Sequence, residues 1–192
     1  MKEIKSYVIN LKRRTDRLKE INLPFQYEVF EATDGKEKFS DFGKMQGHIG
    51  CLDSHRRLIN LAKKDKIETL MVMEDDIEVC EDFNDKLIKV MTELPEDWDL
   101  LYLGGWNVGD VEKYSESLNW AKKVYTTHAF IVRDKFYDTI LEGINSRDWK
   151  VDVLISDVLP LGKCFICEPI LAWQREGFSD IENRVTNNTH LK

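Results

Sequence analysis

The segment Leu70–Glu78 constrains the fold of this chain more than any other part of its sequence. An uninterrupted apolar run from Leu70 to Met73 leads directly into three consecutive carboxylates, Glu74, Asp75 and Asp76. Such a run predicts a strand that is buried on both faces, and the charges mark the point where it leaves the sheet. Open α/β sheets bind ligands outside the carboxyl ends of their strands, so we expect these acids at a binding crevice.

The three acids allow two interpretations. If the backbone stays extended, Glu74 and Asp76 point the same way, with Cα atoms about 7 Å apart. Clustered carboxylates of this kind are ligands that magnesium and manganese prefer, with water and substrate phosphate completing the metal's shell. In the second interpretation the acids open the next helix, where the helix dipole favours negative charge. The local sequence leaves both open.

The overall composition describes a soluble globular protein. The chain has 192 residues, of which 42% are hydrophobic and 33% are charged, enough for one substantial core. Its beginning, Met1–Lys5, contains no secretory apolar region, and no stretch approaches the ~18 apolar residues of a membrane span. We therefore expect a cytoplasmic protein without a transmembrane segment. The net charge of −7 argues against broad nucleic-acid binding and fits a site that holds a cation.

The four cysteines are expected to be thiols in such a reducing compartment. Cys164 and Cys167 have the C-x-x-C spacing, but no second pair and no H-x-H cluster accompanies them. A zinc or redox role needs that added context. Since the pair lies in an apolar, strand-like run that ends at Pro169, we interpret both as buried strand residues.

Alternating apolar runs and intervening helical patterns favour one α/β domain over residues 1–192. The polar segment 106–123 is predicted to be a mobile loop, and residues 182–192 a loosely ordered tail. Strands are predicted at residues 6–11, 25–32, 67–73, 98–105, 124–132 and 164–170.

Two stretches near the predicted strand ends have residues that suit an anion. Arg13 and Arg17 follow the first strand, where their guanidinium groups could bind phosphate in a forked geometry or simply solvate a surface helix. Gly47 and Gly50 precede a predicted helix, where they would let a phosphate or a sugar approach backbone N–H groups. Each signal alone is weak.

Taken in order, these pieces resemble glycosyltransferase family 25, which includes lipopolysaccharide-type and collagen galactosyltransferases. The match extends over nearly the whole chain, and its specificity comes from the order of the motifs. The residues that carry it are Val8-Ile9-Asn10-Leu11 with Arg13, Arg14 and Arg17, Asp34-Gly35, Gly50-Cys51-x-x-Ser54-His55, Met73-Glu74-Asp75-Asp76, the strand from Trp98 to Gly104, Val151-Asp152, and Gln174-Arg175-x-x-x-Ser179-Asp180-Ile181.

The resemblance implies a GT-A-type fold, with a central, mixed and mostly parallel sheet flanked by helices. It also implies a divalent cation, Mn²⁺ or Mg²⁺, held by Glu74 and Asp76, which would grip the diphosphate of a UDP-sugar. The remaining motif residues are implied to contact the donor: Asn10, Arg13, Arg17, Asp34, Ser54, His55, Asp75, Ser179 and Asp180.

The same resemblance implies an inverting transfer of galactose or glucose from UDP-galactose or UDP-glucose to a hydroxyl of a glycan or glycoprotein, as in lipopolysaccharide biosynthesis. Departure of UDP builds negative charge that a cation and arginines stabilise, and the acceptor hydroxyl needs a carboxylate to take its proton. Asp152 matches the family's Val-Asp position and is the candidate base, although a helix-capping acid would look the same.

Two alternatives remain open from the sequence. One is a non-catalytic descendant that binds a sugar or partner through the same cleft, since the chain is short for the family. The other is a metal-dependent phosphoesterase, which lacks the further His and Asp motifs of two-metal sites. His128 could face the cleft, but we favour a hydrogen-bonded core histidine. Peripheral membrane contact would need only a modest surface patch.

Overall fold

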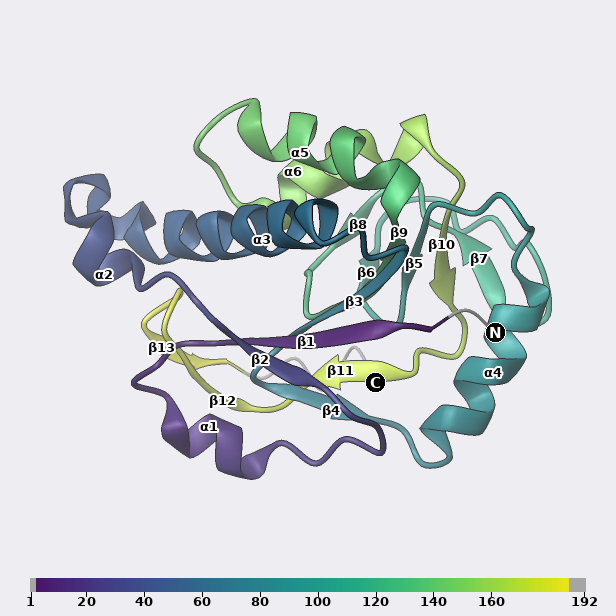
Figure 1. Ribbon diagram of the computed structural model, residues 1–192, viewed down its shortest axis with the longest axis horizontal. Coiled ribbons are helices and arrows are strands. Elements are labelled where there is room, and N and C mark those ends of the chain that lie inside the picture. The colour runs from purple at the N-terminus through teal and green to yellow at the C-terminus, as the bar shows by residue number, and fades with distance from the viewer. Residues whose placement is uncertain (1–2, 187–192) are drawn as a thin grey trace.

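A seven-stranded sheet forms the centre of the molecule (Figure 1). The computed structural model describes residues 3–186. The strands lie in the order β2-β1-β3-β9-β5-β10-β7. Their bounds are β1 Lys5–Asn10, β2 Glu28–Glu31, β3 Thr69–Glu74, β5 Leu100–Tyr102, β7 Leu118–Trp120, β9 Ala129–Arg133 and β10 Cys164–Cys167.

The sheet is mixed but mostly parallel. β1 runs parallel to both of its neighbours, β2 and β3, and β10 runs parallel to β5. β9 is antiparallel to β3 and β5, and β7 is antiparallel to β10. Five strands, β1, β2, β3, β5 and β10, therefore point in one direction and two in the other. The predicted α/β class with a mixed, mostly parallel sheet is confirmed.

Helices cover both faces of this sheet. Figure 1 shows α3, α5 and α6 on one side, and α1 and α4 on the other. The helices are α1 Thr15–Glu20, α2 Gly35–Lys38, α3 Gln46–Lys64, α4 Phe83–Glu93, α5 Tyr137–Asn145 and α6 Val151–Val158, with 3-10 turns η1 Ser40–Met45, η2 Asp134–Phe136 and η3 Leu159–Leu161. Short strands form three further pairs: β4 Ile77–Val79 with β11 Ala172–Gln174, β6 Trp106–Asn107 with β8 Val124–Tyr125, and β12 Gly177–Ser179 with β13 Arg184–Thr186.

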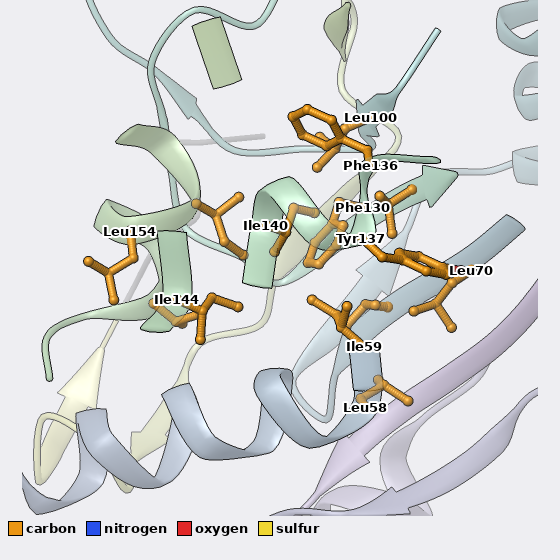
Figure 2. Close-up of a cluster of buried hydrophobic side chains, with 14 of the residues drawn as sticks. Leu58, Ile59, Leu70, Leu100, Phe130, Phe136, Tyr137, Ile140, Ile144 and Leu154 are labelled. Atoms are coloured by element: carbon orange, nitrogen blue, oxygen red, sulfur yellow. The ribbon is translucent and has the colours of Figure 1, made fainter. Parts of the chain in front are cut away.

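The apolar run of β3 divides between two cores, one on each face of the sheet. Leu70 and Val72 belong to the core that includes α3, α5 and α6, part of which Figure 2 shows, while Met71 and Met73 belong to the core that includes α4. All four side chains are buried. Successive side chains of a strand point to opposite faces, so a strand covered on both sides must be apolar at every position.

The segment 106–123 differs from the predicted polar loop. It contains β6 and also β7, which closes one edge of the main sheet by pairing with β10. Leu118 is fully buried there, beside the partly buried Trp120 that packs against Phe165. This part of the segment was predicted as a polar loop and is instead strand, because β7 is only three residues long, too short for its alternation to stand out.

The predicted loose tail is partly ordered by strand pairing. Residues Arg184–Thr186 form β13, which pairs with β12 so that Phe178 lies opposite Val185. Residues 187–192 lie outside the described part of the chain. The hairpin formed by β12 and β13, residues 177–186, reaches the site described below.

Gly104 gives a direct test of the packing beside β5. A Cβ atom at this position would lie 1.8 Å from the carbonyl oxygen of Ala172, which is backbone and cannot rotate away. We expect Gly104→Ala to lower the free energy of unfolding by about 1–3 kcal/mol or more, as overpacked cores do. Chemical denaturation would measure it. Gly177→Ala is the control, since a Cβ there meets nothing within 4 Å. Equal stability of the two variants would contradict this packing.

Candidate functional site

Three parallel strands end side by side at one edge of the sheet. In the pairing register Asn10 of β1 lies beside Glu31 of β2, and Ile9 lies beside Glu74 of β3. The segments that leave these strands, together with the start of α3 and the turn after β12, surround a cleft. This first cleft is lined by Arg13, Arg17, Asp34, Ser54, His55, Glu74, Asp75, Asp76, Ser179 and Asp180, among others.

The acidic segment at the end of β3 forms a turn and continues into β4. The alternative in which these acids open a helix is therefore wrong. Asp75 is buried, where its carboxylate accepts a hydrogen bond of 2.7 Å from Asn10 Nδ2 and another from Arg17 Nη1. Arg175 binds the backbone of the turn, through its N–H to Asp76 O at 2.7 Å and its Nη2 to Asp75 O at 3.2 Å. Asp75 thus fixes the turn, which orients its neighbours.

The carboxylates of Glu74 and Asp76 have fewer hydrogen-bond and ion-pair partners than that of Asp75. Glu74 Oε1 accepts a hydrogen bond of 2.9 Å from Thr127 Oγ1. Asp76 Oδ2 lies 3.5 Å from Arg17 Nη1, whereas its Oδ1 is buried without a hydrogen-bond partner. Burial raises the pKa of both groups, and the nearby Asp76 charge raises that of Glu74 further. A buried carboxylate oxygen without a partner is costly, so this position favours a cation.

Glu74 and Asp76 fit a hard divalent cation as two of its ligands. Within residues 3–186, no three His, Cys, Asp or Glu side chains are grouped as a complete metal site. Mg²⁺ and Mn²⁺ are nevertheless commonly bound through one or two carboxylates, with water and substrate phosphate as the other ligands. The unpartnered Asp76 Oδ1 and the adjacent Glu74 match that pattern.

The raised pKa values of this pair predict a pH dependence of stability. A carboxyl whose pKa is higher in the folded state binds protons more readily there, so its contribution is most favourable at low pH. It is lost as pH rises from about 4.3, the ordinary carboxyl value, through the folded pKa. The doubly substituted Glu74→Gln/Asp76→Asn variant should therefore gain stability over the wild type as pH increases, without added metal.

Thermal unfolding of both proteins from pH 5 to pH 8 would measure this gain. The difference between the two proteins is the relevant quantity, because burial lowers the pKa of His128 and gives an opposite slope that both proteins share. If the difference in unfolding temperature between the two proteins stays constant from pH 5 to pH 8, the pKa values of Glu74 and Asp76 are not raised in the folded state.

The predicted phosphate-binding arginines are engaged with acids. Arg13 donates from Nε to Asp34 Oδ2 at 2.7 Å and from Nη1 to Asp180 Oδ1 at 2.8 Å. Arg14 Nη1 binds the other oxygen of Asp180, and Arg17 Nη2 donates to the carbonyl of Phe178 at 2.7 Å. These bonds outweigh burial and hold the pKa of Asp180 below its ordinary value. The arginines therefore attach the hairpin 177–186 to the end of β1.

Ser54 and His55 lie on α3 and face the first cleft, with their polar atoms largely committed to the protein. Ser54 Oγ accepts the N–H of Thr33 at 2.9 Å and donates to Gly50 O at 2.7 Å. His55 Nδ1 lies 3.0 Å from Cys51 O, and its Nε2 is buried 3.9 Å from Glu74 Oε1. Because a carbonyl can only accept, Nδ1 carries the proton of the neutral ring.

The glycines of this region serve packing. Gly47 and Gly50 lie inside α3, whereas the sequence placed them before it. A Cβ on Gly50 would come within 2.8 Å of Thr33 O, so the helix approaches the end of β2 more closely than any side chain allows. The expected opening of N–H groups toward a ligand does not apply to Gly50.

A second cleft adjoins the first and contains Asp152. Its lining includes His48, Thr126, Thr127, Lys150 and Asp152. The two clefts share Cys51, Glu74, Asp76, Gln174, Ser179 and Ile181. Asp152, in the first turn of α6, accepts the N–H of Thr126 at 3.3 Å through Oδ2 and that of Val153 at 2.9 Å through Oδ1. It is partly exposed, so its carboxylate is both positioned and accessible.

Two expectations about residues outside the site are confirmed. His128 is fully buried, with Nδ1 3.1 Å from Thr126 Oγ1 and Nε2 3.2 Å from Ala172 O, and burial lowers its pKa to about 4. Cys164 and Cys167 are free, buried thiols on β10. They belong to the cores on opposite faces of the sheet, which separates them as ligands for one metal.

Sequence reasoning did not assign Thr127, Gln174 and Arg175 to the site. Thr127 reaches Glu74 because β9 runs antiparallel beside β3, and Gln174 lines both clefts because β11 pairs with β4. Only the Gln174-Arg175 pair had a signal, as part of the closing motif. No local pattern marks Thr127.

No helix within residues 3–186 is both long and apolar enough to cross a membrane. The complete fold is similar to that of A197 from STIV, with a TM-score of 0.51, 12% sequence identity, and coverage of 99% of this chain and 96% of that protein. At this identity the likeness concerns the fold alone.

The sequence is similar to proteins that are named as glycosyltransferases. Human procollagen galactosyltransferase 2 is 28% identical over 125 residues, covering 51% of this chain and 20% of that protein. R655 of Acanthamoeba polyphaga mimivirus, whose name assigns it provisionally to the glycosyltransferases, is 31% identical over 147 residues, covering 67% of this chain and 45% of its own. The chain thus spans about a fifth of the galactosyltransferase's length and under half of the viral protein's. Residues 3–146 match the model of "Glycosyltransferase family 25 (LPS biosynthesis protein)", and the chain belongs to that family.

Proposed function

We propose that this protein is a metal-dependent, inverting glycosyltransferase that moves galactose or glucose from a UDP-sugar to a hydroxyl of a glycan or glycoprotein. Family membership supports glycosyl transfer, with a sugar donor and an acceptor. The identity of the donor and acceptor, the role of the cation and a cytoplasmic location are parts of the proposal.

One observation carries the proposal: two clefts meet at Glu74 and Asp76. The first cleft offers arginines and the acid Asp34 beside the end of β2, which suits a ribose and a diphosphate. The second offers the partly exposed carboxylate of Asp152, which suits an acceptor hydroxyl. A sugar at the junction would lie between its leaving group and its attacking group, as a single displacement requires.

A cation held by Glu74 and Asp76 would supply electrostatic stabilisation of the departing diphosphate. The residues of the chain would do the rest. Asn10 and Arg17 hold Asp75 and so keep the acidic turn in place. Arg13 can exchange its carboxylate partners for phosphate oxygens, because guanidinium binds both in the same forked geometry. Asp152 would take the proton of the acceptor hydroxyl as the new bond forms.

Calorimetry with UDP tests the donor half of this proposal. We expect UDP to bind in the presence of Mn²⁺ and to lose most of its affinity when EDTA replaces the metal. ADP with Mn²⁺ is the control that tests whether the uracil base of UDP is recognised. Release of UDP from UDP-galactose and UDP-glucose then identifies the donor. Failure of UDP to bind in the presence of Mn²⁺ would refute the proposal.

A further inference from the structure

The hairpin 177–186, formed by β12 and β13, is held to the domain by polar contacts rather than by a hydrophobic core. None of its residues is buried, and its large apolar side chains, Phe178 and Val185, are 44% and 66% exposed. Elements that bury little apolar surface open at a low free-energy cost, and a two-stranded hairpin is only marginally stable by itself. The position of this hairpin therefore depends on the groups that bind it.

Those groups are mainly the arginines that follow β1. Asp180, whose side chain is 11% exposed, accepts hydrogen bonds from Arg13 Nη1 at 2.8 Å and from Arg14 Nη1. Arg17 Nη2 donates to the carbonyl of Phe178 at 2.7 Å. Figure 1 shows β12 and β13 near the end of β1, where these arginines lie. We call the contacts of Asp180 with Arg13 and Arg14 the clasp.

The clasp keeps the first cleft narrow. Ser179, Asp180 and Ile181 form part of its wall, as does Arg13. The cleft has a volume of about 120 Å³, whereas pockets for small molecules and cofactors have roughly 300–1,000 Å³. A nucleoside diphosphate therefore needs the wall formed by residues 179–181 to move outward. Ser179 and Ile181 also line the second cleft, so the same movement would widen both.

Asp180 binds the same group that the phosphates of a donor need. A guanidinium group binds a carboxylate and a phosphate in the same forked geometry, so the two compete for Arg13. A diphosphate has more negative charge and more acceptor oxygens than one carboxylate, and it can displace Asp180. The two possible roles of Asp180 predict opposite effects. Loss of a residue that contacts the donor weakens binding, whereas loss of a competitor strengthens it.

We propose that Asp180 is an internal competitor of the donor: the clasp holds the first cleft closed, and a nucleoside diphosphate opens it by taking Arg13 from Asp180. The inference rests on the proposed function, because it requires a phosphate-bearing donor in the first cleft. The apparent affinity of a ligand is reduced by the fraction of protein that is competent to bind it. Weakening the clasp should therefore raise the affinity for UDP.

Calorimetry with UDP and Mn²⁺ tests the sign of this effect. We expect Asp180→Asn to bind UDP about fivefold more tightly than the wild type, the change that corresponds to the upper range of exposed ion pairs. Asp16→Asn is the matched control, since Asp16 also pairs with Arg14, at 2.8 Å, but lies outside the hairpin and lines neither cleft. It removes the same charge, so its affinity for UDP should equal that of the wild type.

Hydrogen exchange of residues 177–186 shows directly whether the hairpin opens. We expect these amides to exchange faster in Asp180→Asn without any ligand, because the clasp is broken. They should also exchange faster in the wild type when inorganic pyrophosphate is added, since it offers the diphosphate without a nucleoside or a sugar. Amides of the central sheet should exchange at the wild-type rate in the variant, which shows that it is folded.

The two measurements separate this inference from the proposed function. If UDP binds the wild type, and Asp180→Asn binds it equally well or more weakly, Asp180 is not a competitor and the inference is wrong. Unchanged or slower exchange of residues 177–186 in Asp180→Asn, or in the wild type with pyrophosphate, would equally overturn it. If UDP binds neither protein, the donor proposal is refuted and the inference that rests on it fails as well.

Discussion

Replacing Asp76 with asparagine should remove the metal-dependent binding of UDP and leave the protein folded. The change keeps the size of the side chain but deletes a charge that faces the junction of the two clefts, where Oδ1 has no hydrogen-bond partner. Loss of groups that merely support a metal ligand costs 10–100-fold in metal affinity, so loss of a ligand should cost on the order of 100-fold or more. Calorimetry with UDP and Mn²⁺ would measure it.

The same variant should unfold at no lower temperature than the wild type without metal. Burial raises the pKa of Asp76, so its charged form is disfavoured in the folded state, and a neutral amide avoids that cost. Asp82→Asn is the matched control, since Asp82 has a positive φ of 55°, which asparagine also tolerates, and it lies outside both clefts. Unchanged UDP affinity in Asp76→Asn would exclude Asp76 as a metal ligand.

Replacing Asp152 with asparagine should abolish most sugar transfer and preserve UDP binding. General base catalysis contributes roughly 10²–10⁴-fold to such rates, and asparagine cannot accept a proton. The affinity for UDP should persist because Asp152 lines the second cleft and not the first. The measurement is release of UDP from the preferred UDP-sugar, with water or a glycan as acceptor, alongside calorimetry on the same sample.

Asp157→Asn on the same helix is the matched control. Asp157 is exposed, pairs with Arg147 at 2.9 Å and lines neither cleft. The amide at position 152 can still accept one of the two N–H groups that the carboxylate accepts, so we expect a stability loss of about 1 kcal/mol. A rate within a few-fold of the wild type would exclude Asp152 as the base. A matching loss of UDP affinity would instead indicate a damaged site.

The arginines after β1 illustrate what a motif can and cannot predict. Their position after the first strand was readable in the sequence, but their position near the acidic turn follows from the parallel pairing of β1 with β3, which only the structure shows. The groups that these arginines bind cannot be predicted from the sequence. Arg13 and Arg14 bind Asp180, which is 167 and 166 positions away in the chain, so any phosphate must compete with a carboxylate already in place. A basic cluster predicts an anion but not which one.

The sequence by itself determined the α/β class, the buried strand β3 and the acids at its end. These follow from short-range physics: an apolar run covered on both faces, and charges where the backbone leaves the sheet. Its motif order also indicated the family. The periodicity of apolar residues and the order of the motifs can both be read directly along the chain, without knowledge of which distant residues come into contact.

Only the tertiary structure decided how the three acids divide their roles. Asp75 is held by Asn10, 65 positions away, and Glu74 by Thr127, 53 positions away, while Asp76 keeps an unpartnered oxygen. The insertion of antiparallel β9 beside β3 produces the second contact, and the junction of the two clefts depends on β11 meeting β4. Strand order and direction are set by the packing of the whole chain, so no local pattern in the sequence carries them.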